Sequence, residues 1–176
     1  MLLTLTHSEM LKLWRTRAGL EPRRTDCTVE RVEGIDADTI IEPRMRAWYL
    51  HLLDTAPAEL LPVDDAAASI SLAGGCGTLP PHVRRLLALR LSSWSTTAIP
   101  ASAEHAARIA APARNPYSAP GTSQPACTVA ARRISVAPWH TGDIVVMATA
   151  VSDPGPDTYI LDESLLSQIP DIFSQQ

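Results

Sequence analysis

The 176-residue sequence is poor in aromatic residues, in lysine and in long apolar runs. Aromatic residues make up 5% of the chain, and Phe173 is its single phenylalanine, so aliphatic side chains and alanine have to supply most of the core. No segment approaches the roughly 20 apolar residues that a membrane-spanning helix needs. The apolar stretch from Met1 to Leu5 lacks the basic segment and the full apolar region of a secretory signal peptide. We therefore expect no membrane anchor and assembly in the cytoplasm.

Cysteine is also scarce. Cys27, Cys76 and Cys127 lie far apart and form no CxxC pair, which argues against a zinc site. An odd number of cysteines does not form a complete set of intramolecular disulfides. The cysteine pattern therefore favours a reducing compartment and predicts neither a metal nor a disulfide framework.

Motifs for catalysis and for cofactor binding are missing as well. The chain contains no GxSxG, HExxH, GxGxxG or GxxxxGK[ST] sequence. Gly74-Gly75-Cys76-Gly77 is the one glycine cluster that could approach a phosphate, but Pro80 and Pro81 follow it and remove two backbone donors. This cluster favours a tight turn. We expect no cofactor and no catalytic residue.

Charge gives weak functional information. The formal net charge is −4 and the isoelectric point is about 5.7, whereas dedicated nucleic-acid-binding domains are usually basic. Three arginine pairs are expected on solvated surfaces, namely Arg23/Arg24, Arg84/Arg85 and Arg132/Arg133. Asp36/Asp38 and Asp64-Asp65 are expected in helix caps and turns, where aspartate is common.

Two N-terminal helices are predicted. Thr6-His7-Ser8-Glu9 has the form of a capping box, and Met10, Leu11, Trp14 and Ala18 follow at helical spacing until Gly19. Asp36 or Asp38 starts a second helix that continues to about Thr55. Its apolar stripe consists of Ile40, Ile41, Met45, Trp48, Tyr49, Leu52 and Leu53.

The middle of the chain predicts a short strand and two further helices. Ser69-Ile70-Ser71-Leu72 alternates as a strand does. A helix is expected from Pro81 to about Trp94, with one face formed by Val83, Leu86, Leu87, Leu91 and Trp94. A shorter helix is expected from Ser102 to Pro112.

The last third of the chain predicts a β hairpin. Thr128 to Val136 and Asp143 to Val151 have strand character, and the short connection between them requires antiparallel pairing. Ile144 to Met147 is continuously apolar, which suggests either burial on both faces or an interface. A turn follows at 153–156, and Asp162 or Ser164 begins a short helix that Pro170 interrupts.

These elements predict an α+β fold with a mainly helical body, a short strand and a C-terminal antiparallel hairpin. Residues 1–111 form the predicted helical body, 112–127 a proline-rich linker, and 128–176 the hairpin and a closing short helix. The linker contains Pro112, Pro116, Pro120 and Pro125. We expect the hairpin to pack with the body as one compact unit.

The order of these elements resembles that of small head-to-tail connector proteins of tailed bacteriophages. The likeness includes the two N-terminal helices, the Leu79-Pro80-Pro81 entry into a helix ending at Trp94, the Asn115-Pro116-Tyr117 loop, the hairpin and the closing helix. It implies a virion component that forms a ring beneath the portal. The implied partners are neighbouring copies, portal and tail proteins, and packaged double-stranded DNA through non-specific contact.

Candidate interface residues on this hypothesis are Tyr117, Arg132, Arg133, Trp139, Val145, Val146 and Met147. Two other classes of function stay open. One is a non-catalytic bacterial binding or regulatory module of α+β fold. The other is a small enzyme with no recognisable motif, in which Cys76, His82 and His140 would have to converge in a deep pocket.

Overall fold

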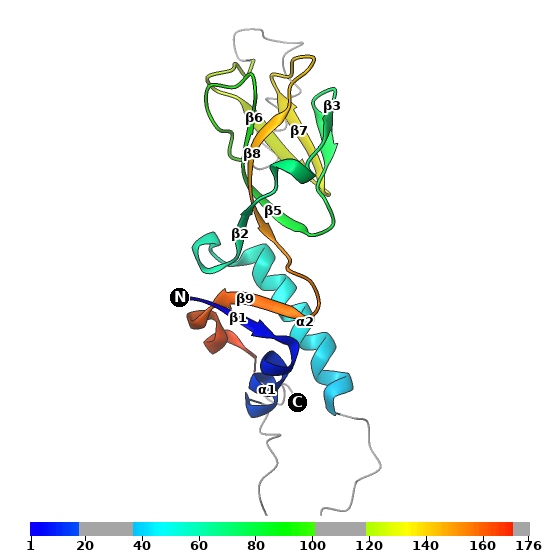
Figure 1. Cartoon of the computed structure of the whole chain (residues 1–176), viewed down its shortest axis with the longest axis vertical. Coiled ribbons are helices and arrows are strands. Elements are labelled where there is room, and N and C mark those ends of the chain that lie inside the picture. Colours follow the sequence, from blue (N-terminus) through cyan, green and yellow to red (C-terminus); the bar gives the residue numbers. More distant parts are fainter. Residues whose placement is uncertain (18–36, 101–118, 171–176) are drawn as a thin grey trace, which may run out of the picture. The chain divides into compact units, whose positions relative to one another are not determined.

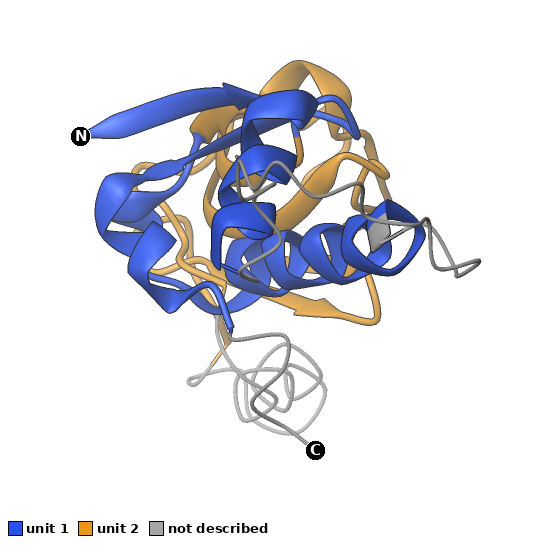
Figure 2. Ribbon diagram, turned by 90° about the horizontal axis from the view of Figure 1, so that it is seen from below, with its two compact units in different colours: residues 1–62, 154–176 blue, residues 63–153 orange. Residues whose placement is uncertain are grey.

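The computed structural model describes residues 1–17, 37–100 and 119–170 (Figure 1). The chain forms two compact units, which Figure 2 shows in different colours. Unit 1 contains Met1–Pro62 and Pro154–Gln176, and unit 2 contains Val63–Asp153. Unit 2 is therefore inserted into the chain of unit 1. The predicted boundary at residue 111, the start of the predicted linker and the predicted helix from Ser102 to Pro112 lie outside the described residues.

Unit 1 combines helices with a two-stranded antiparallel sheet. Strands β1 and β9 pair from Leu2 opposite Asp162 to Thr6 opposite Thr158. The elements of unit 1 are β1 (Leu2–Thr6), α1 (His7–Arg17), α2 (Ala37–Thr55), η1 (Ala58–Leu60), β9 (Thr158–Asp162) and η4 (Glu163–Gln168).

The capping box at the start of α1 is confirmed. The Thr6 N–H donates to Glu9 Oε2 at 2.8 Å, and the Glu9 N–H donates to Thr6 Oγ1 at 3.4 Å. Met10 and Trp14 are buried on one face of the helix, as their spacing predicts. Gly19, the predicted end of the helix, lies outside the described part of the chain.

Helix α2 is also confirmed, and it supplies much of the core of unit 1. Its buried stripe consists of Ile41, Met45, Tyr49, Leu52 and Leu53. Trp14 and Trp48 connect α1 to α2 through an edge-to-face contact with ring centroids 5.7 Å apart. The Arg15 guanidinium and the Asp38 carboxylate form an ion pair between the same two helices. The closing helix is confirmed as the 3₁₀ helix η4, whose first turn is capped by Asp162.

Unit 2 is built from strands. Its two sheets have the strand orders β2-β8-β5 and β3-β4-β7-β6, and all neighbouring strands are antiparallel. The elements are β2 (Val63–Asp65), η2 (Ala67–Ser69), β3 (Leu72–Ala73), β4 (Cys76–Thr78), β5 (Val83–Leu91), β6 (Ala126–Ala130), β7 (Arg133–Ala137) and β8 (Val145–Ser152). The core between them is mainly aliphatic, with Trp94 as its largest buried side chain.

The predicted mainly helical body is wrong, because 36% of the residues are in strands and 31% in helices, and the strands form several antiparallel sheets. The largest error is the helix predicted from Pro81 to Trp94, where the structure contains strand β5. Beside β8, residues Arg84 and Leu87 are extra residues at bulges, so the buried positions Val83, Leu86 and Leu89 fall three apart. This spacing imitates the periodicity of a helix.

The predicted hairpin is also paired incorrectly. Residues 128–136 are not one strand: β6 and β7 pair with each other around Ala131 and Arg132, which both have positive φ angles, +46° and +66°. Strand β8 pairs with β2 and β5. The turn between β6 and β7 contains neither glycine nor proline, so its sequence lacks the usual turn signal.

The region around the glycine cluster shows one error and one confirmed prediction. Ser69 ends the 3₁₀ helix η2, and the strand starts only at Leu72, so the predicted strand from Ser69 is wrong in its first part. Gly74 and Gly75 form the tight turn between β3 and β4, with φ angles of +59° and +76°. A Cβ atom at Gly75 would lie 3.2 Å from the Trp139 Cβ atom, so glycine is needed there for conformation and for space.

Candidate functional site

The predicted interface residues within the described ranges all belong to unit 2. Val145, Val146 and Met147 lie on β8. Arg132 lies in the turn between β6 and β7, Arg133 begins β7, and Trp139 follows it. Tyr117 lies outside the described residues.

The apolar run at the start of β8 is not buried on both faces. Ile144 is 64% exposed and Val146 is 49% exposed, whereas Val145 and Met147 are half-buried. Val146 is the extra residue of a bulge, because Met147 is paired with Arg90 and Val145 with Leu91. The bulge therefore exposes the Val146 side chain to solvent. A regular strand of the same sequence would place this side chain differently.

An open groove of about 510 Å³ lies next to these exposed side chains. It is lined by Arg90, Leu91, Ser92, Val146 and Met147, and we call this set the β8 groove. Ile144 adjoins it, because its carbonyl oxygen accepts the Ser92 N–H at 3.0 Å. The groove offers apolar contact surface and one cationic side chain, which suits association with another protein surface.

Asp143 fixes the turn that precedes β8. Its Oδ2 atom accepts the His140 N–H at 2.8 Å and the Ser93 hydroxyl at 2.9 Å, and its Oδ1 atom accepts the Ser92 hydroxyl at 3.2 Å. Burial raises the pKa of this carboxyl, whose side chain is 4% exposed, but the three hydrogen bonds and the nearby His140 ring together hold the pKa below its ordinary value. Asp143 and its serine partners were not among the predicted site residues, although an aspartate just after a glycine in a predicted turn is a usable signal.

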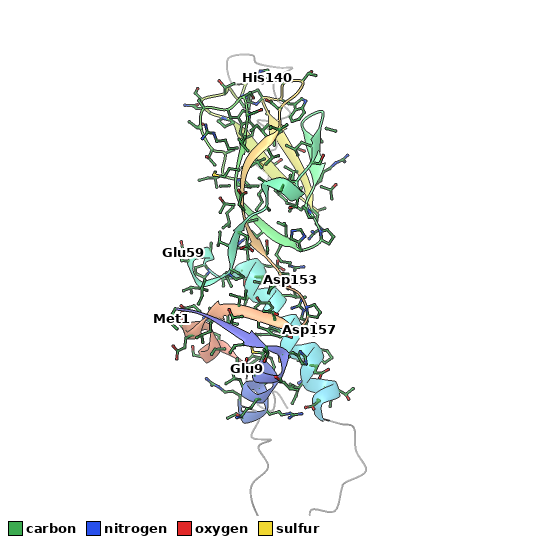
Figure 3. All side chains as sticks on the ribbon, viewed as in Figure 1. Met1, Glu9, Glu59, His140, Asp153 and Asp157 are labelled. Atoms are coloured by element: carbon green, nitrogen blue, oxygen red, sulfur yellow. The ribbon has the colours of Figure 1, made fainter. Side chains whose placement is uncertain are left out.

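Ser93, His140 and Asp143 have the composition of a hydrolase triad but not its geometry. Figure 3 labels His140, which comes from the segment between β7 and β8. Its Nδ1 atom lies 3.2 Å from Ser93 Oγ and 3.5 Å from Asp143 Oδ2. In a triad the serine and the carboxylate bind opposite ring nitrogens, so that the imidazole can accept the serine proton while the carboxylate orients it. Here the carboxylate accepts the serine hydroxyl directly, and the cluster holds the turn together.

Cys76 has a side-chain contact of its own, whereas His82 bonds Asp153 through its backbone. Cys76 Sγ lies 3.9 Å from Ser135 Oγ, and the His82 carbonyl oxygen accepts the Asp153 N–H at 2.8 Å. Across the ranges that the structure describes, no hydrogen bond or ion pair joins any two of Cys76, His82 and His140. The described contacts therefore do not join this candidate set.

The two adjacent arginines have different environments. The Arg132 guanidinium donates to the carbonyl oxygens of Leu79 and Val83, each at 3.2 Å, and to that of Pro80. It therefore satisfies the backbone that leads into β5. Arg133 is exposed, so of the two it is the side chain presented to solvent for contact with DNA or protein.

Neither a metal centre nor a related protein identifies the site. No group of three or more His, Cys, Asp or Glu side chains within residues 1–17, 37–100 and 119–170 could hold a metal ion. Neither α1 nor α2 has the length and apolar composition that a membrane span requires. Comparison of the chain with protein-family models, curated proteins and solved structures finds no match.

Proposed function

We propose that this protein is a non-catalytic structural subunit of a tailed-phage particle, a head-to-tail connector that assembles as a ring beneath the portal. The observation that carries the proposal is the exposed apolar surface formed by Val146 of the β8 groove and by the adjoining Ile144. Exposed apolar side chains that flank a groove are a common property of assembly surfaces. The partner we assign to this surface is a neighbouring copy of the same chain.

The resemblance to connector proteins now depends on fewer elements. Helices α1 and α2 and the closing helix η4 are present in the expected order. The third helix and the predicted hairpin, which contributed to the resemblance, are replaced by β5 and by different strand pairing. The portal and tail proteins remain proposed partners, and Arg133 is a candidate for non-specific contact with packaged DNA. The proposed location is the virion, after assembly in the bacterial cytoplasm.

Val146→Asp tests the assembly surface. A carboxylate at this exposed bulge should leave unit 2 folded but oppose burial of the groove against a second copy. The matched control is Val63→Asp, because Val63 is also an exposed valine, 41% accessible, and lies on β2 in the same sheet. We expect light scattering and electron microscopy to show rings for the wild type and for Val63→Asp, and smaller species for Val146→Asp.

Three outcomes would contradict this proposal. Rings that persist in Val146→Asp would show that the β8 groove is not the contact. A wild-type protein that never forms rings, alone or with the portal, would favour the binding-module alternative. If mass spectrometry does not detect the protein in purified phage particles, the protein is not a virion component.

A further inference from the structure

The small sheet of unit 1 has two edges that differ in how they are covered. Strands β1 and β9 lie side by side in Figure 1, and each pairs only with the other among the described strands. In an antiparallel pair, alternate residues direct their N–H and C=O groups toward the partner strand and away from it. Each strand therefore has an outer edge with its own backbone donors and acceptors.

The direction of these groups follows from the hydrogen bonds at both ends of the pair. The His7 N–H donates to the Asp157 carbonyl at 3.0 Å, and the Glu163 N–H donates to the Met1 carbonyl at 3.4 Å. The odd-numbered residues of β1 therefore face β9. Leu2 and Thr4 face outward, as does Ile160, the residue of β9 opposite Thr4.

On the outer edge of β9, the backbone of Ile160 is satisfied by a side chain. The buried Tyr49 hydroxyl accepts the Ile160 N–H at 3.0 Å and donates to the Ile160 carbonyl at 3.2 Å. The Tyr49 hydroxyl of helix α2 thereby bonds both the N–H and the C=O of Ile160.

The outer edge of β1 has no such cover among the described residues. No hydrogen bond to the backbone N–H or C=O of Leu2 or Thr4 is formed from residues 1–17, 37–100 or 119–170, and both residues are exposed. Thr6 differs, because its N–H is bonded to Glu9 at the start of α1. The sequence of β1, Leu-Leu-Thr-Leu-Thr, contains neither a charge nor a proline, which are the residues that usually protect an edge strand from pairing.

We propose that β1 pairs antiparallel with β1 of a second copy of this chain, about a twofold axis at Leu3. In this register Leu2 of each copy lies opposite Thr4 of the other, and the two Leu3 residues lie opposite each other. The two pairs of Leu2 and Thr4 form four backbone hydrogen bonds and satisfy all the outward groups of both residues. The product is a four-stranded sheet in the order β9-β1-β1-β9.

A second copy fits this edge because the free groups are self-complementary. A twofold rotation about Leu3 brings Leu2 of one copy opposite Thr4 of the other, so the outward donors and acceptors of the two copies match. A shift of the axis to Thr4 would place Leu2 opposite Thr6, whose N–H is already bonded to Glu9, and would form fewer bonds. Like charges do not face each other in the pair, since β1 has none. The contact uses unit 1 and does not depend on the ring proposal for the β8 groove.

Thr4→Pro tests the pairing. Proline removes the outward N–H of Thr4 without loss of a bond to β9, and edge strands tolerate proline at such positions. Thr4→Val is the matched control, because it retains the N–H and the preference for a strand. All variants are measured as the full chain carrying Val146→Asp, so that the proposed ring contact does not contribute to the oligomeric state.

Sedimentation equilibrium over a concentration series gives the dimer dissociation constant. We expect Thr4→Val to have the same dimer dissociation constant as its parent. Thr4→Pro should raise this constant about tenfold or more, because the twofold symmetry causes the hydrogen bond to be lost in both copies. A parent that is monomeric at every concentration would overturn the proposal. Equal dimerisation of Thr4→Pro and Thr4→Val, with circular dichroism showing both folded, would also overturn it.

Oxidative cross-linking provides a second test that does not depend on the folding of the proline variant. In a Cys27→Ser, Cys76→Ser, Val146→Asp background, Leu3→Cys should form a disulfide-linked dimer. The two Leu3 residues form a non-hydrogen-bonded pair, in which the Cα atoms lie about 4.5 Å apart, a distance that a disulfide can span. Leu5→Cys is the control, since Leu5 is half-buried on the same face of β1 but would lie roughly 14 Å from its copy. Equal cross-linking of both variants, or of neither, would contradict the register.

Discussion

The hydroxyl group of Tyr49 on α2 forms two hydrogen bonds with the backbone of Ile160 on β9, accepting its N–H at 3.0 Å and donating to its carbonyl at 3.2 Å. Tyr49 is fully buried, and its ring also packs edge-to-face on Tyr159 with centroids 4.9 Å apart. One side chain therefore packs the core of unit 1 and satisfies both backbone groups of one residue at a strand edge. Without the hydroxyl, both backbone groups of Ile160 would lose this partner at a partly buried position.

We expect Tyr49→Phe to lower the free energy of unfolding by about 1–3 kcal/mol, because the ring packing remains but the Ile160 backbone becomes unsatisfied. Urea denaturation monitored by circular dichroism measures the change. Tyr159→Phe is the comparison, because the Tyr159 hydroxyl lies 3.5 Å from His7 Nδ1, a longer contact than either Tyr49 hydrogen bond, and its loss should cost less. A smaller effect for Tyr49→Phe than for Tyr159→Phe would contradict this assignment.

Asp143 predicts acid sensitivity of the turn that precedes β8. Its pKa is lower in the folded protein than in the unfolded chain, so ionisation stabilises the fold above about pH 4, and this contribution is lost as the pH falls through the folded pKa. Asp143→Asn should lower the free energy of unfolding by about 2 kcal/mol at pH 7. Urea midpoints of both proteins at pH 7 and pH 3 should show that the difference shrinks in acid. A difference that does not depend on pH would argue against the stabilising carboxylate.

The described cysteines should differ in reactivity. Burial raises the pKa of the Cys127 thiol to about 12, and Cys127 is 1% exposed, whereas Cys76 is exposed. Because the thiolate is the reactive form, Cys127 in a Cys27→Ser, Cys76→Ser variant should not react with Ellman's reagent at pH 8 until urea unfolds the protein. In the matched Cys27→Ser, Cys127→Ala variant, Cys76 should react at once. Rapid reaction of Cys127 in the folded protein would show that β6 opens readily.

Substitutions of Arg132 and Arg133 should differ in their effect on stability, because Arg132 bonds the backbone and Arg133 is exposed. Arg132→Ala removes the donors to three carbonyl oxygens before and at the start of β5, and we expect it to lower the free energy of unfolding by about 1–3 kcal/mol. Arg133→Ala changes an exposed side chain and should alter stability by less than about 0.5 kcal/mol. Thermal unfolding compares the two. Equal effects would mean that the Arg132 contacts contribute little.

If Arg133 contacts packaged DNA, Arg133→Ala should reduce the salt dependence of DNA binding by about one phosphate contact. Fluorescence anisotropy with double-stranded DNA at several salt concentrations measures this slope. An unchanged slope would remove Arg133 from the proposed DNA contact.

Local sequence signals were sufficient where the structure depends on neighbours in the chain. Thr6 and Glu9 form the capping box, α2 ends at Thr55 as predicted, and Gly74 and Gly75 form the expected turn. Each of these features is decided by hydrogen bonds or backbone conformations within a few residues. The same reasoning applies to the Asp162 cap of η4, whose Oδ1 atom accepts the Ser164 N–H at 3.0 Å.

The candidate site was predicted only in part. The apolar run that includes Val146 is visible in the sequence, but its exposure depends on the bulge opposite Arg90 and Leu91. Ser92, Ser93 and Asp143 meet across roughly 50 residues of sequence, and no spacing rule predicts such a contact. The Arg132/Arg133 pair predicts two surface residues, but the Arg132 guanidinium donates to backbone carbonyl oxygens.

The sequence by itself determined the helices of unit 1, the caps and the glycine turn, because these depend on local hydrogen bonds and on residue conformation. The tertiary structure alone decided that Val83 to Leu91 is a strand, that β8 pairs with β2 and β5, and that unit 2 is inserted into unit 1. Strand pairing joins residues distant in sequence, and a bulge changes the spacing of buried side chains from two to three. Buried residues three apart are compatible with a helix or with a bulged strand, and only pairing with the partner strand selects between the two.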